Sequence, residues 1–184
     1  GIWARDIGAM AGVNVPLYAA EHMYVMTEAD PAIPPDLPVL RDTDGYVYVK
    51  EDAGKLLVGA FEPNAKPLPL SALPEKFEFG ELQEDWDQFE LPMSHAMEMI
   101  PMLQNVGIRH FMNGPESFTP DNRFIVGEAP ELKNFFVGAG FNSQGILSSP
   151  GIGRALAEWI VEGKATMDLS EIDIARFHPF QANR

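Results

Sequence analysis

Apolar residues at the start of the chain recur at the three- and four-residue steps of one helix face. The residues that fit this stripe are Ile2, Trp3, Ile7 and Met10. We therefore predict a helix in residues 1–12 and interpret it as the second half of a helix that begins in a longer protein.

From Asn14 the pattern changes to short β-prone runs separated by turn residues. The runs cover residues 15–27, 38–41, 46–50 and 55–61. Asp44-Gly45 and Asp52-Ala53-Gly54 separate the last three, and such residues favour tight turns. Strands that follow one another through tight turns predict an antiparallel meander.

A second helical stripe runs through residues 85–103. Its apolar members are Trp86, Phe89, Met93, Met97, Ile100 and Leu103. Pro92 lies inside it and either kinks this helix or starts a second one. Residues 106–112 then alternate as a strand does, and we expect this strand to end at Asn113-Gly114-Pro115.

The last third of the chain has a different character. Residues 135–139 form a continuous apolar run, typical of a strand buried on both faces of a parallel-type sheet. A glycine-rich turn follows, and residues 154–162 have helical amphipathicity. Serine before the helix, Pro150 in its first turn and Gly163 after its end are the expected start and stop signals.

Composition narrows the function classes. The 184 residues include 13 Lys+Arg and 27 Asp+Glu, a formal charge of −14 that would repel a nucleic acid backbone. No apolar run approaches the roughly 18 residues of a membrane span, so we expect a soluble chain without a membrane partner. Cysteine is absent, which excludes disulfides and cofactors linked through sulfur. No metal-ligand spacing is found, and no metal site is predicted.

The turn after residue 139 combines glycines with the start of a predicted helix. Glycine lets a ligand approach the backbone closely, and unpaired amides at a helix start carry partial positive charge. This combination favours a site for an anion or a dipole. Glycine also serves close packing, so both interpretations stay open. The candidate residues are Gly138, Gly140, Phe141, Gln144, Gly145, Ile146, Gly151 and Gly153.

A second set of candidates comes from the β-prone runs. Tyr46 and Tyr48 are two residues apart and so would share one face of a strand, and His22 lies in an earlier strand. Imidazole titrates near neutral pH, and a tyrosine hydroxyl can orient a substrate amine. Arg41 and Arg123 are isolated bases that could bind an acidic substrate, because guanidinium pairs well with carboxylate. A structural histidine and ordinary ion pairs are the alternatives.

Three stretches of sequence carry a family resemblance. The first, within residues 1–27, contains Gly-Ile-Trp-Ala-Arg and Glu-His-Met-Tyr-Val-Met-Thr. The second, residues 37–48, contains Leu-Pro-Val-Leu-Arg-Asp and Gly-Tyr-Val-Tyr. The third, residues 113–163, contains Asn-Gly-Pro, Thr-Pro-Asp and Val-Gly-Ala-Gly-Phe. Together they resemble the C-terminal part of the flavin domain in the dimethylglycine/sarcosine dehydrogenase family, within the D-amino-acid-oxidase-like class.

The resemblance implies an α+β fold. An antiparallel substrate-domain sheet with helices would be joined to a partial FAD-binding α/β segment that lacks its N-terminal Rossmann half. Residues 1–12 would end a helix of the FAD domain, and residues 13–118 would form the substrate domain. Residues 119–165 would return to the FAD-binding domain, and residues 166–184 would lead out to a downstream domain.

The resemblance also implies an activity, the oxidation of an N-methyl amino acid of the sarcosine or dimethylglycine type by hydride transfer to FAD. His22 and Tyr48 match the family's catalytic positions and would hold the amine neutral and oriented. Tyr46 is the alternative to Tyr48, and Tyr46, Arg41 and Arg123 are the candidates for substrate binding. The glycine-rich set, from Gly138 to Gly151, would contact FAD without a covalent link.

The sequence departs from the family pattern in two ways. It contains no Gly-x-Gly-x-x-Gly fingerprint for the dinucleotide pyrophosphate, and no upstream histidine for a covalent flavin link. We therefore expect a larger enzyme with an N-terminal FAD-binding region, in the cytoplasm or, in a eukaryote, the mitochondrial matrix. The resemblance also implies a folate-binding domain downstream. Oxidation of another amino acid and a non-catalytic binding module are the alternative functions.

Overall fold

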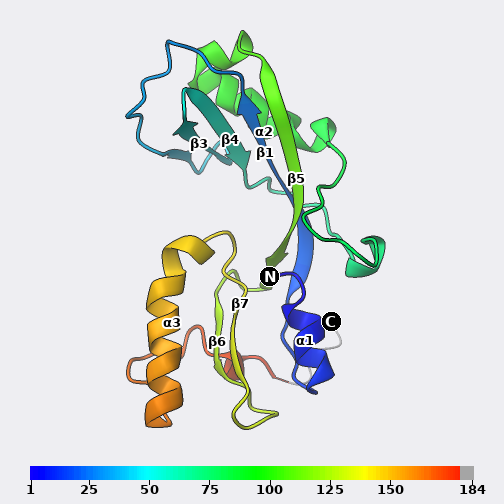
Figure 1. The fold of residues 1–184 in the computed structure, drawn as a ribbon, viewed down its shortest axis with the longest axis vertical. Helices are drawn as coiled ribbons and strands as arrows, with labels where there is room; N and C mark the ends of the chain where they lie inside the picture. Colours follow the sequence, from blue (N-terminus) through cyan, green and yellow to red (C-terminus); the bar gives the residue numbers. More distant parts are fainter. Residues whose placement is uncertain (179–184) are drawn as a thin grey trace. The chain divides into compact units, whose positions relative to one another are not determined.

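A computed structural model describes residues 1–178, and the chain divides into two compact units (Figure 1). Unit 1 comprises Gly1–Ala20, Leu68–Ala72 and Glu116–Arg184, and unit 2 comprises Glu21–Pro67 and Leu73–Pro115. The fold mixes helices with an antiparallel sheet, which confirms the predicted α+β class. The assignment of residue ranges to a substrate domain and an FAD-binding domain stays a prediction.

The described residues contain three helices, seven strands and three short 3-10 helices. In chain order they are α1 (Ala4–Met10), β1 (Tyr18–Thr27), β2 (Leu40–Asp42), β3 (Val47–Asp52), β4 (Lys55–Ala60), η1 (Leu70–Ala72), α2 (Trp86–Met99), η2 (Pro101–Gln104), β5 (Ile108–Phe118), β6 (Ile125–Glu128), β7 (Phe136–Ala139), α3 (Gly145–Glu162) and η3 (Ile174–Arg176).

The five-stranded sheet has the order β2-β3-β4-β1-β5. The β2-β3-β4 meander is as predicted, and Ala53 and Gly54, with φ of 51° and 78°, make the tight turn between β3 and β4. β1 does not precede β2 in the sheet. It pairs instead with β4, a position for which the sequence pattern made no prediction.

The two faces of this sheet in unit 2 have different roles. Side chains alternate along each strand, so Val25, Val49 and Val58 share one face, where each is completely buried. Helix α2 packs against β3 and β4, and its Phe89 joins the same core. The opposite face of the sheet, which helix α2 does not cover, carries Tyr48 and the residues that alternate with the buried valines.

Helix α2 and strand β5 each run through a proline. α2 begins after the Asp85 cap, whose side chain accepts a 3.0 Å hydrogen bond from the Gln88 amide, and it continues through Pro92 without starting a second helix. β5 does not end at 113–115 as predicted but extends to Phe118, so it contains Pro115. Proline has no backbone N–H, but β5 is an edge strand, and on its free side no hydrogen bond to a neighbouring strand is lost.

Helix α1 in unit 1 confirms the predicted N-terminal helix, but its apolar stripe is exposed. Trp3, Ile7 and Met10 are 42%, 58% and 88% accessible. The buried side is the one that carries Gly8, because a Cβ there would lie 2.7 Å from a methyl group of Val15. The helix therefore packs through its smallest residue.

Two predictions about the last third of the chain are wrong. β7 pairs antiparallel with β6, and its residues alternate between buried and accessible instead of being buried on both faces. α3, which packs on both strands, begins at Gly145, so Pro150 lies inside the helix instead of in its first turn. The carbonyl of Ile146, which proline leaves without an amide partner, accepts a 3.5 Å hydrogen bond from the Ser149 hydroxyl. Gly163 ends the helix as predicted, with φ of 72°.

Candidate functional site

Three of the predicted site residues meet around one phenylalanine in unit 2. The Phe61 amide donates a 2.8 Å hydrogen bond to the Tyr46 carbonyl, which continues the sheet pairing just beyond β4. Ring centroids lie 4.9 Å apart for His22 and Phe61 and 5.7 Å apart for Tyr48 and Phe61. The Arg41 guanidinium stands 5.2 Å from the centre of the same ring. We call His22, Arg41, Tyr48 and Phe61 the Phe61 cluster.

Gly59 makes room for this cluster. It pairs with Tyr24 of β1 on one side and Tyr48 of β3 on the other, so all three positions share the face that α2 does not cover. A Cβ at Gly59 would lie 2.0 Å from Cζ and 2.2 Å from the hydroxyl oxygen of Tyr48. The Tyr48 ring therefore lies directly on the Gly59 backbone. Any residue larger than glycine at position 59 would displace this ring.

Tyr46 lies apart from Tyr48. Its φ of 63° places it in the left-handed region, just before β3 begins at Val47. Alternation requires an extended backbone, so the two tyrosines do not share a strand face as predicted. The Tyr46 ring instead lies 6.4 Å from the ring of His95, whose Nδ1 is 3.0 Å from the Gly45 carbonyl oxygen.

The two candidate arginines have different surroundings. Arg41 is exposed and stacks on Phe61 in the cluster. Arg123 belongs to unit 1, where its guanidinium forms an ion pair with the carboxylate of Glu171. Arg123 thus shows the ion pair that was its alternative interpretation, and its role in substrate binding stays a prediction.

A half-buried carboxylate follows the cluster directly in sequence. Burial raises the pKa of Glu62, whereas a hydrogen bond from its own backbone amide and the charge of His22 lower this pKa, and the charge of Glu21 raises it slightly. Its Oε1 is fully buried, and no described protein group donates a hydrogen bond to it. Sequence reasoning missed Glu62, although a charged residue directly after the apolar run of residues 55–61 was the available signal.

A polar network lies beside Glu62. Asn113 donates a 2.7 Å hydrogen bond to Glu21, and the ammonium of Lys66 lies 3.4 Å from the same carboxylate. Lys66 also donates a 2.8 Å hydrogen bond to Asp85, which lowers the pKa of that carboxyl. Lys66 is thus shared between the carboxylates of Glu21 and Asp85.

The glycine-rich turn of unit 1 is held by side chains that sequence reasoning also missed. Asn142 and Ser143 have φ of 48° and 65°. Buried Asn142 accepts a 3.0 Å hydrogen bond from the Thr119 amide and donates one of 3.0 Å to the Thr119 hydroxyl. Ser143 donates a hydrogen bond of 2.5 Å to Glu116. These bonds hold the left-handed turn in shape.

The candidate glycines in this turn divide into two groups. Internal packing explains Gly140, where a Cβ would lie 2.4 Å from Thr119, and Gly138, where it would lie 3.0 Å from Leu156. Outside its own helix and chain neighbours, no described atom lies within 4 Å of a Cβ built on Gly151, and Ile146 is 96% accessible. Packing within the described residues therefore does not explain the glycine at position 151 or the exposed side chain of Ile146.

The start of α3 offers free amides. Its cap residue, Gln144, makes no side-chain hydrogen bond to the helix, and Gly145 is the first helical residue. The first amides of a helix have no intrahelical acceptor and carry partial positive charge. Before these residues, the ring of Phe141 packs on that of Phe124, with their centroids 4.9 Å apart and the rings tilted by 47°. Bare backbone, free amides and accessible Ile146 fit a planar ligand with a polar edge.

We expect Asn142→Ala to lower the free energy of unfolding by about 2 to 3 kcal/mol, because Thr119 would lose its two buried hydrogen bonds with Asn142. Thermal or urea unfolding measures this loss. Ser170→Ala, at an exposed hydroxyl of the same unit, is the control and should change stability far less. Equal effects of the two substitutions would contradict the role of Asn142 in holding the turn.

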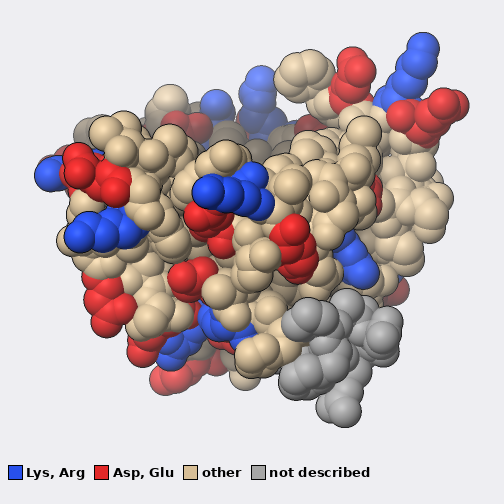
Figure 2. Space-filling view, turned by 90° about the horizontal axis from the view of Figure 1, so that it is seen from below, with Lys and Arg blue, Asp and Glu red and all other residues tan. Residues whose placement is uncertain are grey.

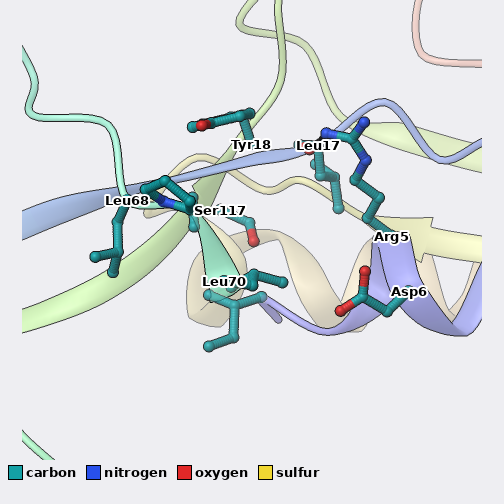
Figure 3. A pocket seen from close by; sticks show the side chains of 10 residues that line it. Arg5, Asp6, Leu17, Tyr18, Leu68, Leu70 and Ser117 are labelled. Carbon is teal, nitrogen blue, oxygen red and sulfur yellow. Dashed lines mark hydrogen bonds between the residues drawn. The ribbon is translucent and has the colours of Figure 1, made fainter. Parts of the chain in front are cut away.

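Unit 1 also contains a cavity of about 220 Å³ beside α1 (Figure 3). Apolar residues such as Leu17, Leu68 and Leu70 line it, and Arg5 donates a 3.2 Å hydrogen bond to the Leu17 carbonyl at its rim. The Ser117 hydroxyl is buried there without a hydrogen-bond partner among the described residues. None of the predicted site residues lines this cavity.

Charged side chains of both signs are interspersed on the face drawn in Figure 2. Several bases are paired, for example Arg176 with Asp121 at 2.7 Å and Arg154 with Glu158 at 2.6 Å. Within residues 1–178, no group of three or more His, Cys, Asp or Glu side chains is arranged to hold a metal ion. In the same part of the chain, no helix is long and apolar enough to cross a membrane.

Comparison with known proteins identifies the family. The family of FAD dependent oxidoreductases, DAO, matches residues 1–159. The chain is 50% identical to 4-methylaminobutanoate oxidase (formaldehyde-forming) of Paenarthrobacter nicotinovorans, over 100% of this chain and 22% of that protein. It is 44% identical to mitochondrial sarcosine dehydrogenase of Mus musculus, over 97% of this chain and 19% of that protein. Glycine oxidase from Geobacillus kaustophilus has a similar structure, with a TM-score of 0.74 and 25% identity over 97% of this chain and 44% of that one.

The chain therefore spans about a fifth of the length of the two curated relatives. The match extends over most of the chain and includes both the Phe61 cluster and the start of α3. The family predicted from the three sequence stretches is confirmed: this chain belongs to the FAD-dependent oxidoreductases.

Proposed function

We propose that the protein to which this chain belongs oxidises the N-methyl group of an N-methylated amino acid of the sarcosine, dimethylglycine or 4-methylaminobutanoate type. The Phe61 cluster is the observation that carries this proposal, because it brings a histidine, a tyrosine and an arginine together on one sheet face. Relatives named for the oxidation of methylated amines support it. FAD, when bound, accepts the hydride that leaves the methyl carbon.

Each residue of the cluster would have a different role in binding the substrate. Arg41 would bind the carboxylate, for which a guanidinium has the matching geometry. His22 and Tyr48 would hold the amine as its neutral form, because a protonated amine has no lone pair to assist the loss of hydride. Phe61 would form an apolar wall between these polar groups and keep water away from the reacting carbon.

The start of α3 would hold the flavin without a covalent link. Its free amides suit the pyrimidine edge, where a reduced flavin carries negative charge. Among the predicted contact residues, the exposed ones are the best supported, since packing within the chain does not account for them. The set is Gly138, Gly140, Phe141, Gln144, Gly145, Ile146 and Gly151. A downstream folate-binding domain and a cytoplasmic or mitochondrial location also remain proposals.

The test is anaerobic reduction of the full-length flavoprotein by a panel of amino acids. We expect sarcosine, dimethylglycine or 4-methylaminobutanoate to bleach the flavin absorbance, with formaldehyde released in the open reaction. Glycine and proline are the comparison substrates, because they lack the N-methyl group. Reduction by glycine or proline alone would contradict the proposal and favour an oxidase of another amino acid.

We expect the isolated 184-residue chain to bind FAD little or not at all. The physical reason is that its sequence has no Gly-x-Gly-x-x-Gly turn to hold the pyrophosphate, which supplies much of the contact with a dinucleotide. Titration of FAD with the chain, followed by the flavin absorbance, measures this, and the full-length protein is the positive control. A shifted spectrum at one FAD per chain would favour a module that works alone.

A further inference from the structure

The turn between β2 and β3, residues 43–46, lies beside two members of the Phe61 cluster. Arg41 of β2 is the direct partner of Tyr48 of β3 in the register, so the two side chains share one sheet face. Both also pack on the ring of Phe61. Because the turn of a hairpin fixes its register, the conformation of residues 43–46 determines where the guanidinium and the tyrosine ring stand.

The backbone of this turn is strained at Tyr46. Its φ of 63° lies in the left-handed region, which is uncommon for a large aromatic residue. Gly45, directly before it, is buried between two neighbours, since a Cβ there would lie 2.5 Å from the Asp42 carboxylate and 3.2 Å from Cβ of His95. Strain of this kind persists only where the surrounding groups hold the backbone in place.

Two consecutive carbonyl groups of the turn are bound from outside the hairpin. Nδ1 of His95, on α2, lies 3.0 Å from the Gly45 carbonyl oxygen. A carbonyl oxygen can only accept a hydrogen bond, so this Nδ1 carries the proton. The next carbonyl, that of Tyr46, accepts the 2.8 Å hydrogen bond from the Phe61 amide. The turn is thus held between α2 and the centre of the cluster, all within unit 2.

His95 ties the turn to the core of the unit. It is half-buried on the helix that packs against β3 and β4. The ring of the strained Tyr46 lies beside its own, with centroids 6.4 Å apart. The 3.0–3.1 Å contact that Asp42 makes with the Asp44 amide lies, in contrast, inside the hairpin and shapes the turn without fixing it to the helix.

We propose that His95 is a positioning residue of the substrate site. Its Nδ1–H group holds the Gly45 carbonyl and so keeps Arg41 and Tyr48 in place on Phe61. This inference rests on the proposed function and deepens it, because it adds a residue that acts on the site from the helix-covered face of the sheet. His95 acts through the turn in this role and does not touch the substrate.

Two substitutions of nearly equal shape test the hydrogen bond in the full-length flavoprotein. The amide nitrogen of His95→Asn can take the place of Nδ1 and donate to Gly45, whereas the carboxylate of His95→Asp can only accept and would repel the carbonyl. We expect His95→Asn to reduce its flavin with sarcosine within about threefold of the wild-type rate. His95→Asp should be about 10- to 100-fold slower, because a small displacement of positioned groups costs this much. Equal rates in the two variants would overturn the proposal.

Glu98 provides the matched control, since it is an exposed residue of the same helix. Glu98→Asn and Glu98→Asp differ from each other in the same way as the two His95 variants. We expect both to reduce their flavin at the wild-type rate. All rates are compared at equal bound flavin, so that a smaller amount of folded protein does not count as slower chemistry.

A double-variant comparison distinguishes positioning from a general effect on the fold. In a protein that carries Arg41→Ala and Tyr48→Ala, the groups that His95 is proposed to position are absent. His95→Asp should then slow the remaining reduction by less than about threefold. A loss as large as in the otherwise wild-type protein would overturn the proposal, because His95 would then not act through Arg41 and Tyr48.

Binding of butanoate gives a readout that does not depend on turnover. Butanoate has the shape of sarcosine with a methylene group in place of the amine, and the change in flavin absorbance measures its binding. We expect His95→Asp to weaken butanoate about tenfold, because Arg41 is displaced, and His95→Asn to bind it as the wild type does. Wild-type binding in His95→Asp would overturn the proposal, because Arg41 would not have moved.

The outcomes separate this inference from the proposed function. If the wild-type flavin is not reduced by any N-methyl amino acid, the proposed function fails. If it is reduced and His95→Asp is reduced as fast as the wild type, only the role of His95 fails.

Discussion

Replacement of Gly59 by alanine is expected to lower the rate of flavin reduction in the full-length protein about 100-fold while leaving its Tm nearly unchanged. The new Cβ would lie 2.0 Å from Cζ of Tyr48, so the ring must leave its position in the cluster. The atoms that must move are the far end of one side chain on an open sheet face, and the backbone does not need to shift. Catalytic geometry is therefore expected to suffer much more than stability.

Gly114→Ala is the matched control for this substitution. Gly114 lies in β5 of the same sheet, and a Cβ there would meet only the side chain of Met112, at 3.4 Å. We expect this variant to reduce its flavin at the wild-type rate. In a protein that already carries Tyr48→Ala, Gly59→Ala should have almost no further effect. An additive loss in the double variant would show that Gly59 does not act through Tyr48.

Substitution of the two predicted catalytic residues gives the second large effect. We expect His22→Ala to slow anaerobic flavin reduction by about 10² to 10³-fold, since a side chain that controls a proton typically contributes this much. Tyr48→Phe keeps the ring on Phe61 and removes only the hydroxyl, so a loss of about tenfold is expected. Stopped-flow absorbance at saturating substrate measures both rates without a contribution from reoxidation.

His110→Ala is the control for the histidine substitution. His110 lies in β5 of the same unit, where it is half exposed and its Nε2 is 3.3 Å from a carboxylate oxygen of Glu81. We expect this variant to keep the wild-type rate of reduction. Unchanged reduction in both His22→Ala and Tyr48→Phe would remove the Phe61 cluster from the reaction.

Much of unit 2 could be predicted because its signals are local. Apolar alternation and the Asp52-Ala53-Gly54 turn determine the β3–β4 hairpin within a few residues. The position of β1 depends instead on which edge strand of the meander it pairs with. This pairing joins residues far apart in sequence, and the alternation of apolar residues does not predict it. Pro115 was misread as the end of β5 for the same reason, because only sheet order reveals that β5 lies at an edge.

The candidate site was predictable where the chemistry belongs to the residue type. His22, Arg41 and Tyr48 were singled out for their functional groups, and the sheet register brings them to one phenylalanine. Gly59 and Glu62 were missed because their importance lies in their neighbours. The sequence around Gly59 does not indicate that the Tyr48 ring packs on it, and the sequence around Glu62 does not indicate that its carboxylate is partly buried.

The glycine-rich turn shows the limits of composition in another way. Gly140 and Gly151 look equivalent in sequence. Contact with Thr119 requires a glycine at position 140, whereas a Cβ at position 151 would meet no described atom within 4 Å outside its own helix and chain neighbours. Asn142, which holds the turn through Thr119, carried no signal because its partner is 23 residues away.

A crystal structure of the full-length flavoprotein with bound butanoate tests the central claim most directly, because this inert ligand marks the carboxylate position of the substrate. The Phe61 cluster predicts butanoate against Phe61, with its carboxylate hydrogen-bonded to Arg41 and its carbon chain passing His22 and Tyr48. Butanoate bound at Arg123, or in the cavity beside Ser117, with the Phe61 cluster unoccupied, would contradict the assignment of this sheet face as the substrate site.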